Sequence, residues 1–294
     1  LSCLDLNTGA ITDVADWSNA DFVCNDMAYD YSSDCIYAMC RRIYTDEDLN
    51  FSIEYSTLLK VDPKTGKYTV AKDFLTDYSG LSNPVFLTLA CDLQGNLYSI
   101  NIAGQLVKFD KEKNFSQKII GSTGMSPGKY LQCMDFDHET EKLYWAADYK
   151  NKVSNFCLVD TKTGHATEIG ALGTDSRIAG LYIPFDLPAD GAPGSAVDFT
   201  VNPAAKGELS ASLSWTNPSQ TFGNNALTSL TKVEVKRAGK VIKEFASPKP
   251  GEKMTFNDTS VPASGLYEYC VVATNAAGVG KSTTQEAWVG RDVP

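Results

Sequence analysis

The stretch MAYDYSSDCIYAMC, Met27 to Cys40, joins two apolar segments through a polar turn. Two further stretches repeat it: LACDLQGNLYSI, Leu89 to Ile100, and MDFDHETEKLYWAA, Met134 to Ala147. In each stretch an aspartate precedes a tyrosine by six or seven residues, with polar turn residues between them. Short apolar segments on either side of such a turn predict a β-hairpin.

Each hairpin is followed by two more strand-like segments. The third segments are STLLKVD, Ser56 to Asp62, GQLVKFD, Gly104 to Asp110, and NFCLVD, Asn155 to Asp160, and the fourth are KYTVAKDF, FSQKII and HATEIGAL. Four short antiparallel strands that recur about every 50 residues are typical of propeller blades. The predicted fold class is therefore all-β, with a β-propeller-like domain of four-stranded antiparallel blades over residues 1–186.

A short element, Asp-x-x-Thr-Gly, joins the third and fourth segments. It occurs as VDPKTG, Val61 to Gly66, as VDTKTG, Val159 to Gly164, and as LDLNTG, Leu4 to Gly9. Aspartate can accept backbone N–H bonds in a turn, and glycine supplies a positive φ. The second repeat has DKEKNF here, without Thr and Gly. A hairpin tolerates that change better than a calcium loop does, so the element predicts a structural turn.

The three complete four-strand repeats do not by themselves predict a closed propeller ring. Three are complete, and IAGLYIPF, Ile178 to Phe185, predicts a fourth inner strand. The outer strands of that blade could come from LSCLDLNTGAITDV at the start of the chain, or blades could be missing upstream. We expect a chain cut from a longer protein, because it starts within a strand-like segment.

Charge and composition separate a second domain. Residues 1–186 hold 16 Lys and Arg against 26 Asp and Glu, a balance of −10, whereas residues 195–294 hold 10 against 9. LPADGAPG, Leu187 to Gly194, has a linker's composition. The predicted boundaries are 1–186, a linker over 187–194, and a second domain over 195–294.

The second domain resembles a fibronectin type III module. LSASLSWTNP places Trp215 in an alternating strand, and GLYEYCVVATNAAGVGKST, Gly265 to Thr283, places Tyr267 where that family has its corner tyrosine. The resemblance implies an immunoglobulin-like β-sandwich. A propeller followed by such a module resembles modular surface proteins of gut anaerobic bacteria, described as adhesins or appended to secreted peptidases. The segment TSLTKVEVKRAGKVIKEF, Thr228 to Phe245, is similar to the fibronectin-like modules in those proteins. The resemblance implies an extracellular or outer cell-surface location.

Net charge and cysteine pattern narrow the function classes. The net charge of −10 argues against nucleic acid and against anionic membrane surfaces, and no apolar run approaches a membrane span. The eight cysteines include no Cys-x-x-Cys, and both histidines lie apart from paired cysteines, so we expect no metal and no cofactor. Cys24 and Cys40 are predicted to fall nearly opposite each other in the first hairpin.

The candidate binding residues are aromatic. In an antiparallel blade, the long loops that join strands two and three, and successive blades, share one face, and loops carry function on rigid scaffolds. Aromatic rings with polar neighbours suit protein or sugar surfaces. The candidates on the predicted long loops are Trp17, Tyr44, Tyr55, Tyr78, Tyr130 and Tyr149.

These observations favour a non-catalytic binding or adhesion module. The long-loop face would recognise a protein or a glycan, with the sandwich as a spacer, and we expect a monomer within a longer modular chain. No nucleophilic triad or phosphate-loop pattern is present, so no catalytic residue is predicted. Two alternatives remain open: an enzyme, either a propeller enzyme or the accessory region of a longer secreted hydrolase or peptidase, and a purely structural stalk.

Overall fold

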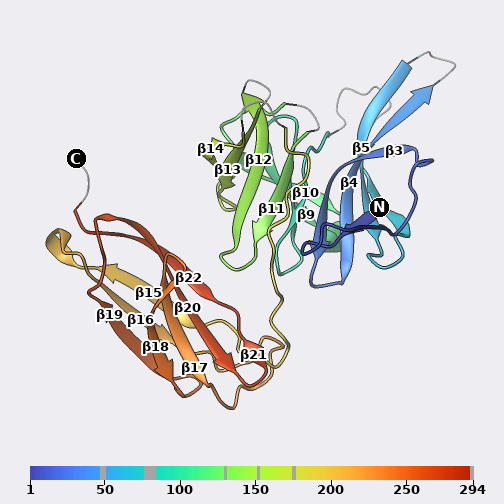
Figure 1. The fold of residues 1–294 in the computed structure, drawn as a ribbon. Helices are drawn as coiled ribbons and strands as arrows, with labels where there is room; N and C mark the ends of the chain where they lie inside the picture. The colour runs from blue at the N-terminus through green and yellow to red at the C-terminus, as the bar shows by residue number, and fades with distance from the viewer. Residues whose placement is uncertain (47–50, 76–83, 129–130, 151–152, 174–176, 292–294) are drawn as a thin grey trace. The chain divides into compact units, whose positions relative to one another are not determined.

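The protein is all-β and antiparallel throughout (Figure 1). The structure, a computed structural model, describes residues 1–46, 51–75, 84–128, 131–150, 153–173 and 177–291. The chain divides into two compact units, Leu1–Pro184 and Phe185–Pro294. No helix in these ranges is long and apolar enough to cross a membrane.

Three four-stranded sheets make up most of the first unit. Sheet 1 consists of β3 (Phe22–Asp30), β4 (Cys35–Asp46), β5 (Phe51–Val61) and β6 (Tyr68–Asp73). Sheet 2 consists of β7 (Ala90–Cys91), β8 (Leu97–Ile100), β9 (Gln105–Asp110) and β10 (Ser116–Ser122), with a 3₁₀ turn, η1 (Lys111–Lys113), between the last two. Sheet 3 consists of β11 (Cys133–Asp137), β12 (Lys142–Lys150), β13 (Val153–Val159) and β14 (Ala166–Ala171). Strands pair in chain order in each of these three sheets, which confirms the predicted hairpins.

Apolar side chains fill the spaces between successive sheets. One cluster joins sheets 1 and 2, and a second joins sheets 2 and 3. In the first cluster Phe74, Phe86 and Phe109 lie with ring centroids 4.9–5.5 Å apart. Burying a phenylalanine side chain contributes about 1.5–3 kcal/mol. Consecutive residues Leu58 and Leu59 are both fully buried, because sheet 1 is covered on both faces.

One carboxylate connects the first strands of the three sheets. Asp26 is buried in β3, and its carboxylate accepts the amide N–H of Met27 at 3.0 Å, of Leu89 at 2.8 Å and of Met134 at 3.0 Å. Those three residues begin the three aligned repeats of the sequence, so equivalent amides from each sheet meet at a single side chain. Strands β3, β7 and β11 are accordingly in mutual contact. Burial raises the pKa of Asp26, while the amide bonds oppose that rise.

The Asp-x-x-Thr-Gly element forms the same turn in all three copies, as predicted. In the β5–β6 turn, Asp62 Oδ1 accepts the amides of Lys64 at 2.8 Å and Thr65 at 3.0 Å. Asp5 and Asp160 accept equivalent amides in their own turns. Gly66 has φ +65°, and a Cβ there would lie 2.3 Å from the Cβ of Ala15. Glycine is therefore required both for the backbone conformation and for the close approach of the N-terminal segment.

The predicted fourth inner strand over Ile178–Phe185 is wrong. Residues 177–185 form no strand. Two of their amides bond to side chains of sheet 3 instead. The Ile178 N–H donates to Ser154 Oγ at 2.7 Å, and the Ile183 N–H donates to Asp135 Oδ2 at 2.7 Å. Burial raises the pKa of Asp135 to about 6, although the amides of Ile183 and Phe136 oppose that rise.

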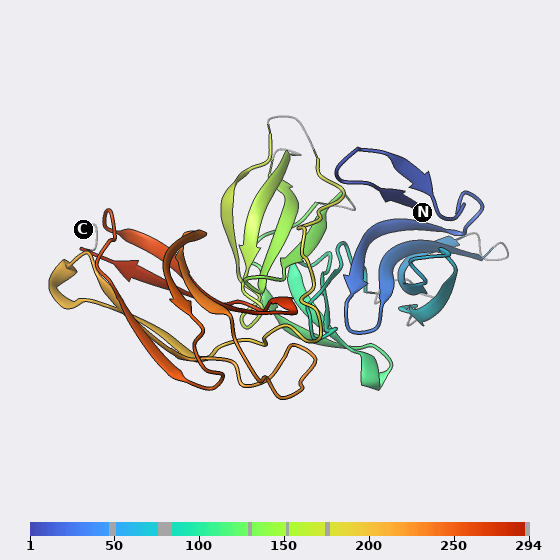
Figure 2. The same ribbon diagram turned by 60° about the horizontal axis from the view of Figure 1, so that its bottom comes forward.

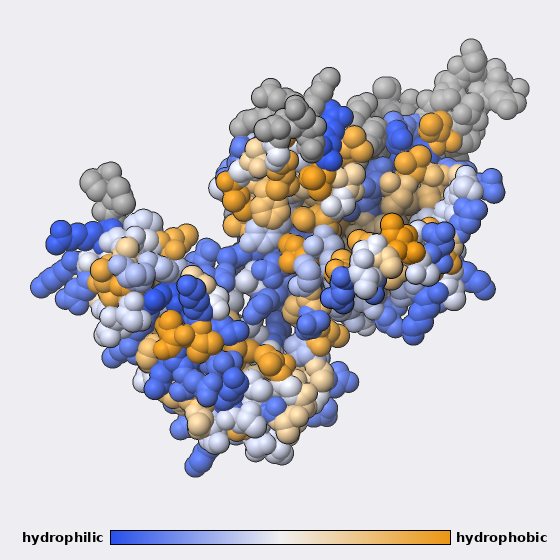
Figure 3. Space-filling view, in the orientation of Figure 1, coloured by the Kyte–Doolittle hydropathy of each residue, from blue (hydrophilic) through white to orange (hydrophobic). Residues whose placement is uncertain are grey.

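The start of the chain forms the predicted hairpin, as a separate two-stranded sheet of β1 (Ser2–Leu4) and β2 (Ile11–Asp13). Figure 2 shows this hairpin, in dark blue, beside sheet 1. Leu1 packs against the outer face of sheet 1, whereas Leu4, Leu6 and Ile11 are exposed. On the face shown in Figure 3, apolar residues form separate patches among hydrophilic ones, which is normal for folded proteins.

The two cysteines predicted to oppose each other do so. Cys24 of β3 is the cross-strand neighbour of Cys40 of β4, and the turn between the strands spans residues 31–34. All eight cysteines are free thiols in this structure.

The C-terminal unit contains two sheets. The three-stranded sheet consists of β15 (Val197–Pro203), β16 (Ala211–Thr216) and β19 (Lys253–Asp258). The five-stranded sheet consists of β17 (Lys232–Arg237), β18 (Lys240–Ala246), β20 (Gly265–Asn275), β21 (Gly278–Val279) and β22 (Thr283–Val289), and a second 3₁₀ turn, η2, covers Ala205–Gly207. Trp215 and Tyr269, from different sheets, lie buried in one core. The Tyr267 hydroxyl donates to the Ala263 carbonyl at 3.0 Å, four residues upstream.

Candidate functional site

The six aromatic candidates are not brought together among the described side chains. Tyr78 and Tyr130 lie outside the described residues, and Tyr44 lies in β4 with its side chain outside the description. The remaining three, Trp17, Tyr55 and Tyr149, are described and are all partly buried.

Trp17 packs against sheet 1. Its ring meets Phe22 and Tyr68 edge to face, with centroids 5.8 and 5.6 Å away, and its indole N–H donates to the Gly66 carbonyl at 3.1 Å. Tyr55 lies in β5, six residues before the end of that strand, roughly 20 Å along an extended chain. Trp17 is therefore fixed beside the β5–β6 turn and away from Tyr55.

Tyr149 belongs to another sheet. It lies in β12 of sheet 3, and its hydroxyl donates to Glu168 of β14. The described candidates thus occupy separate places on two sheets. Trp17 and Tyr149 each make structural contacts of their own.

A pocket of ≈ 680 Å³ lies at the end of sheets 1 and 2 where the short turns gather. In sheets whose strands pair in chain order, the turns between strands one and two and between strands three and four share one end. Ser32 of the β3–β4 turn, residues 94–96 of the β7–β8 turn, and residues 108–113, 116 and 118 around the β9–β10 turn line this pocket. It therefore combines turns of sheets 1 and 2.

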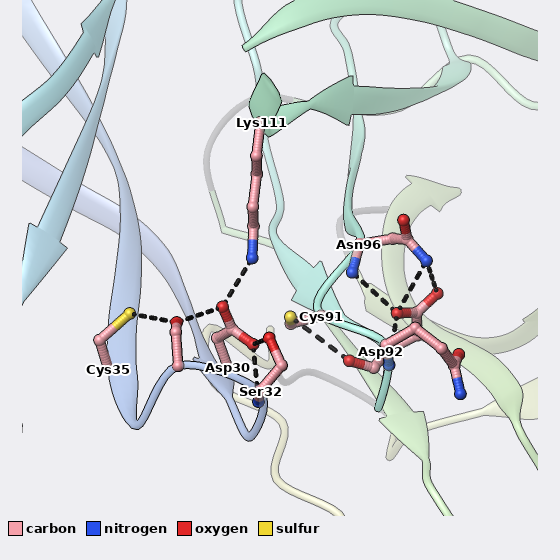
Figure 4. Close-up of polar contacts among 9 residues, drawn as sticks. Asp30, Ser32, Cys35, Cys91, Asp92, Asn96 and Lys111 are labelled. Carbon is pink, nitrogen blue, oxygen red and sulfur yellow. Dashed lines mark hydrogen bonds and ion pairs between the residues drawn. The ribbon is translucent and has the colours of Figure 1, made fainter. Parts of the chain in front are cut away.

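The wall of the pocket is held by a buried ion pair (Figure 4). The Lys111 ammonium lies 2.6 Å from Asp30 Oδ2, and the Asp30 side chain is completely buried. Asp30 also accepts the hydroxyl of Ser32 at 2.6 Å and that of Ser33 at 2.5 Å. Burial alone would raise the pKa of Asp30, but Lys111 and the two serines outweigh it and lower the pKa to about 2. The Lys111 ammonium also lies 4.9 Å from the centroid of the Tyr37 ring.

Beside this pair, Figure 4 shows two thiols and a capped turn. Cys35 Sγ lies 3.2 Å from Ser33 Oγ, and the Cys91 thiol donates to the Asp92 carbonyl at 3.5 Å. Asp92 caps the β7–β8 turn by accepting the backbone N–H and the side-chain amide of Asn96. Burial raises the pKa of Cys91, so this sulfur is a thiol at neutral pH and a poor nucleophile.

Four lysines line the pocket. Lys111 pairs with Asp30, and Lys113 pairs with Asp110 at 2.9 Å. Lys108 of β9 and Lys118 of β10 are direct cross-strand neighbours. Among the residues that the structure describes, neither of these two ammonium groups is paired with a carboxylate. The pocket thus concentrates positive charge in a unit whose charged residues are predominantly acidic.

Sequence reasoning placed the binding face at the long loops and missed this pocket. The available signal was the run KFDKEKNFSQK, Lys108 to Lys118, which has four lysines in a chain of net charge −10. Turn chemistry predicted the hairpin there, but the pairing of Lys111 with Asp30 joins residues 81 positions apart. Within the described ranges, no group of three or more His, Cys, Asp or Glu side chains converges as a metal site.

Comparison with known proteins gives weak structural similarities. No protein-family model matches the chain, and no curated protein sequence matches it. An FN3 domain, FN3tt mut, is 20% identical, covering 33% of this chain and 94% of its own, with a TM-score of 0.24. The luciferin-regenerating enzyme is 12% identical, covering 73% of this chain, with a TM-score of 0.34, and the chain spans 61% of that enzyme.

A third similar structure, the Dos1 propeller, is 10% identical, covering 90% of this chain and 72% of its own, with a TM-score of 0.29. At these identities and TM-scores, none of the three carries an argument about activity. The site is therefore interpreted from its own residues.

Proposed function

We propose that the chain is a non-catalytic binding module: a β-propeller-type domain that recognises a glycan or a protein, followed by a fibronectin type III module that acts as a spacer. Three stacked four-stranded sheets whose first strands meet at Asp26 support the propeller interpretation. The Tyr267 hydroxyl bond to Ala263, next to a core that contains Trp215, supports the fibronectin interpretation. The proposed location is outside the cell, on a bacterial surface.

The pocket at the turn end of sheets 1 and 2 is the observation on which the binding function depends. It has the volume of a small-ligand site and is built from turns on rigid sheets. Its wall is fixed by a buried ion pair, so little ordering is needed on binding. The proposed ligand site is thus at the short turns, and the aromatic long-loop residues become secondary candidates.

A glycan and protein array with the full chain tests this function. We expect binding to a restricted set of ligands, lost in Ser116→Trp, which fills the pocket from an exposed position in β10. Thr69→Trp is the matched control, because Thr69 is exposed in β6 and lines a smaller pocket of ≈ 390 Å³ on sheet 1. No binding on broad arrays, or turnover of a ligand by the wild-type chain, would contradict the proposal.

A further inference from the structure

We propose that this pocket takes a sugar that carries a sulfate or phosphate group, and that Lys108 and Lys118 bind the anion. The inference rests on the proposed binding function and specifies its ligand. It depends on how the four lysines of the pocket are placed and paired.

Lys108 and Lys118 are opposed across β9 and β10 in direct register. Side chains in that relation have Cβ atoms about 4.5–5.5 Å apart, and like charges there repel each other. An anion between the two ammonium groups converts that repulsion into two charge-assisted contacts. The pair is therefore unfavourable in the empty pocket and favourable in the loaded one.

The other two lysines have partners of their own. Lys111 is held by the buried Asp30, and Lys113 by Asp110. Glu112 also lines the pocket and offsets one positive charge. Lys108 is oriented by the Tyr98 ring, whose centroid lies 5.3 Å from its ammonium nitrogen. The two lysines that remain available for an anion are thus the opposed pair.

The rest of the lining suits a sugar. A volume of ≈ 680 Å³ is far larger than one sulfate or phosphate ion needs. Gln94 and Ser116 bring an amide and a hydroxyl group that can bond to sugar hydroxyls, whereas the Ser32 hydroxyl and the Asn96 amide already donate to Asp30 and Asp92. A long polyanion is disfavoured by the net charge of −10, whereas a short anionic sugar fits within the pocket.

Calorimetric titration of the full chain tests the assignment with four probes: glucosamine 6-sulfate, glucose 6-phosphate, glucose and inorganic sulfate. We expect at least one of the two anionic sugars to bind at least tenfold more tightly than glucose and than inorganic sulfate, with affinity that falls as salt rises. Which of the two is preferred distinguishes a sulfated from a phosphorylated ligand. Equal affinity for glucose, or for inorganic sulfate, would overturn the proposal.

Variants locate the site. The double variant Lys108→Gln and Lys118→Gln should lose at least tenfold in affinity for the anionic sugar, whereas Lys64→Gln with Lys162→Gln, two exposed lysines of equivalent turns, should not. Unchanged affinity of the double variant, or an equal loss in the control variant, would refute the assignment. Array binding to neutral glycans alone would refute this inference and leave the proposed function standing.

Discussion

Replacing Asp26 by asparagine tests whether one side chain joins the three sheets. The carboxylate offers both oxygens to amides of β3, of Leu89 just before β7, and of β11, at 2.8–3.0 Å. Asparagine has nearly the same shape but only one acceptor oxygen. When the asparagine oxygen faces the Leu89 and Met134 amides, the NH₂ group faces the Met27 amide. In the flipped orientation, the NH₂ group faces the Leu89 and Met134 amides. In either orientation, buried donors are set against each other.

The expected loss follows from the number of unsatisfied groups. Each buried donor without an acceptor costs about 1–3 kcal/mol, and the substitution leaves at least two, the NH₂ group and one amide. Burial raises the pKa of Asp26, so the ionised acid carries a desolvation cost that asparagine lacks, and this offsets part of the loss. We expect a net loss of about 2–4 kcal/mol, against a typical domain stability of about 5–15 kcal/mol.

Urea unfolding followed by hydrogen-exchange mass spectrometry measures this loss for each unit. Peptides from Leu1–Pro184 should lose protection at lower urea, and peptides from Phe185–Pro294 should not change. Asp13→Asn, at an exposed position in β2, is the control and should leave both transitions in place. An unchanged transition in the first unit would refute the role of Asp26, and so would an equal shift of both units.

Three further perturbations test local features. Gly66→Ala should lower the melting temperature of the first unit by more than Gly9→Ala does. Both glycines have positive φ, but of the two only Gly66 has an atom, Ala15 Cβ, in the place that a Cβ would take. Equal shifts would show that backbone strain alone matters. The pKa of Asp30 is lowered to about 2. Its ion pair therefore stabilises the fold fully above pH ~4 and progressively less as the pH falls to about 2. Acid titration of Asp30→Asn should therefore show a shallower stability loss over that interval than wild type, and parallel curves would contradict the ion-pair geometry. Tyr267→Phe should cost the second unit about 0.5–1.5 kcal/mol in urea unfolding by removing the hydroxyl bond to Ala263, and no loss would mean that this bond contributes nothing.

Local chemistry explains which expectations were confirmed. The turn of Asp62 and Gly66 closes within five residues, and the hairpin of Asp30 and Tyr37 within eight, so the residue order was sufficient for both. The strand predicted over Ile178–Phe185 is absent, and its apolar pattern could not reveal that Asp135 and Ser154 would accept two of its amides. The sequence pattern likewise did not reveal that Trp17, one of the aromatic candidates, packs against Gly66 and Tyr68.

The amino-acid order by itself determined the hairpins, the turns and the four-strand repeat, because these depend on contacts between near neighbours in the chain. Only the tertiary structure brought Asp26 to amides 63 and 108 residues away, and Asp30 to Lys111 across two sheets. The sequence around a polar residue is the same whether its side chain faces water or a distant strand. Its partner, and with it the pocket of opposed lysines, is decided when the sheets pack.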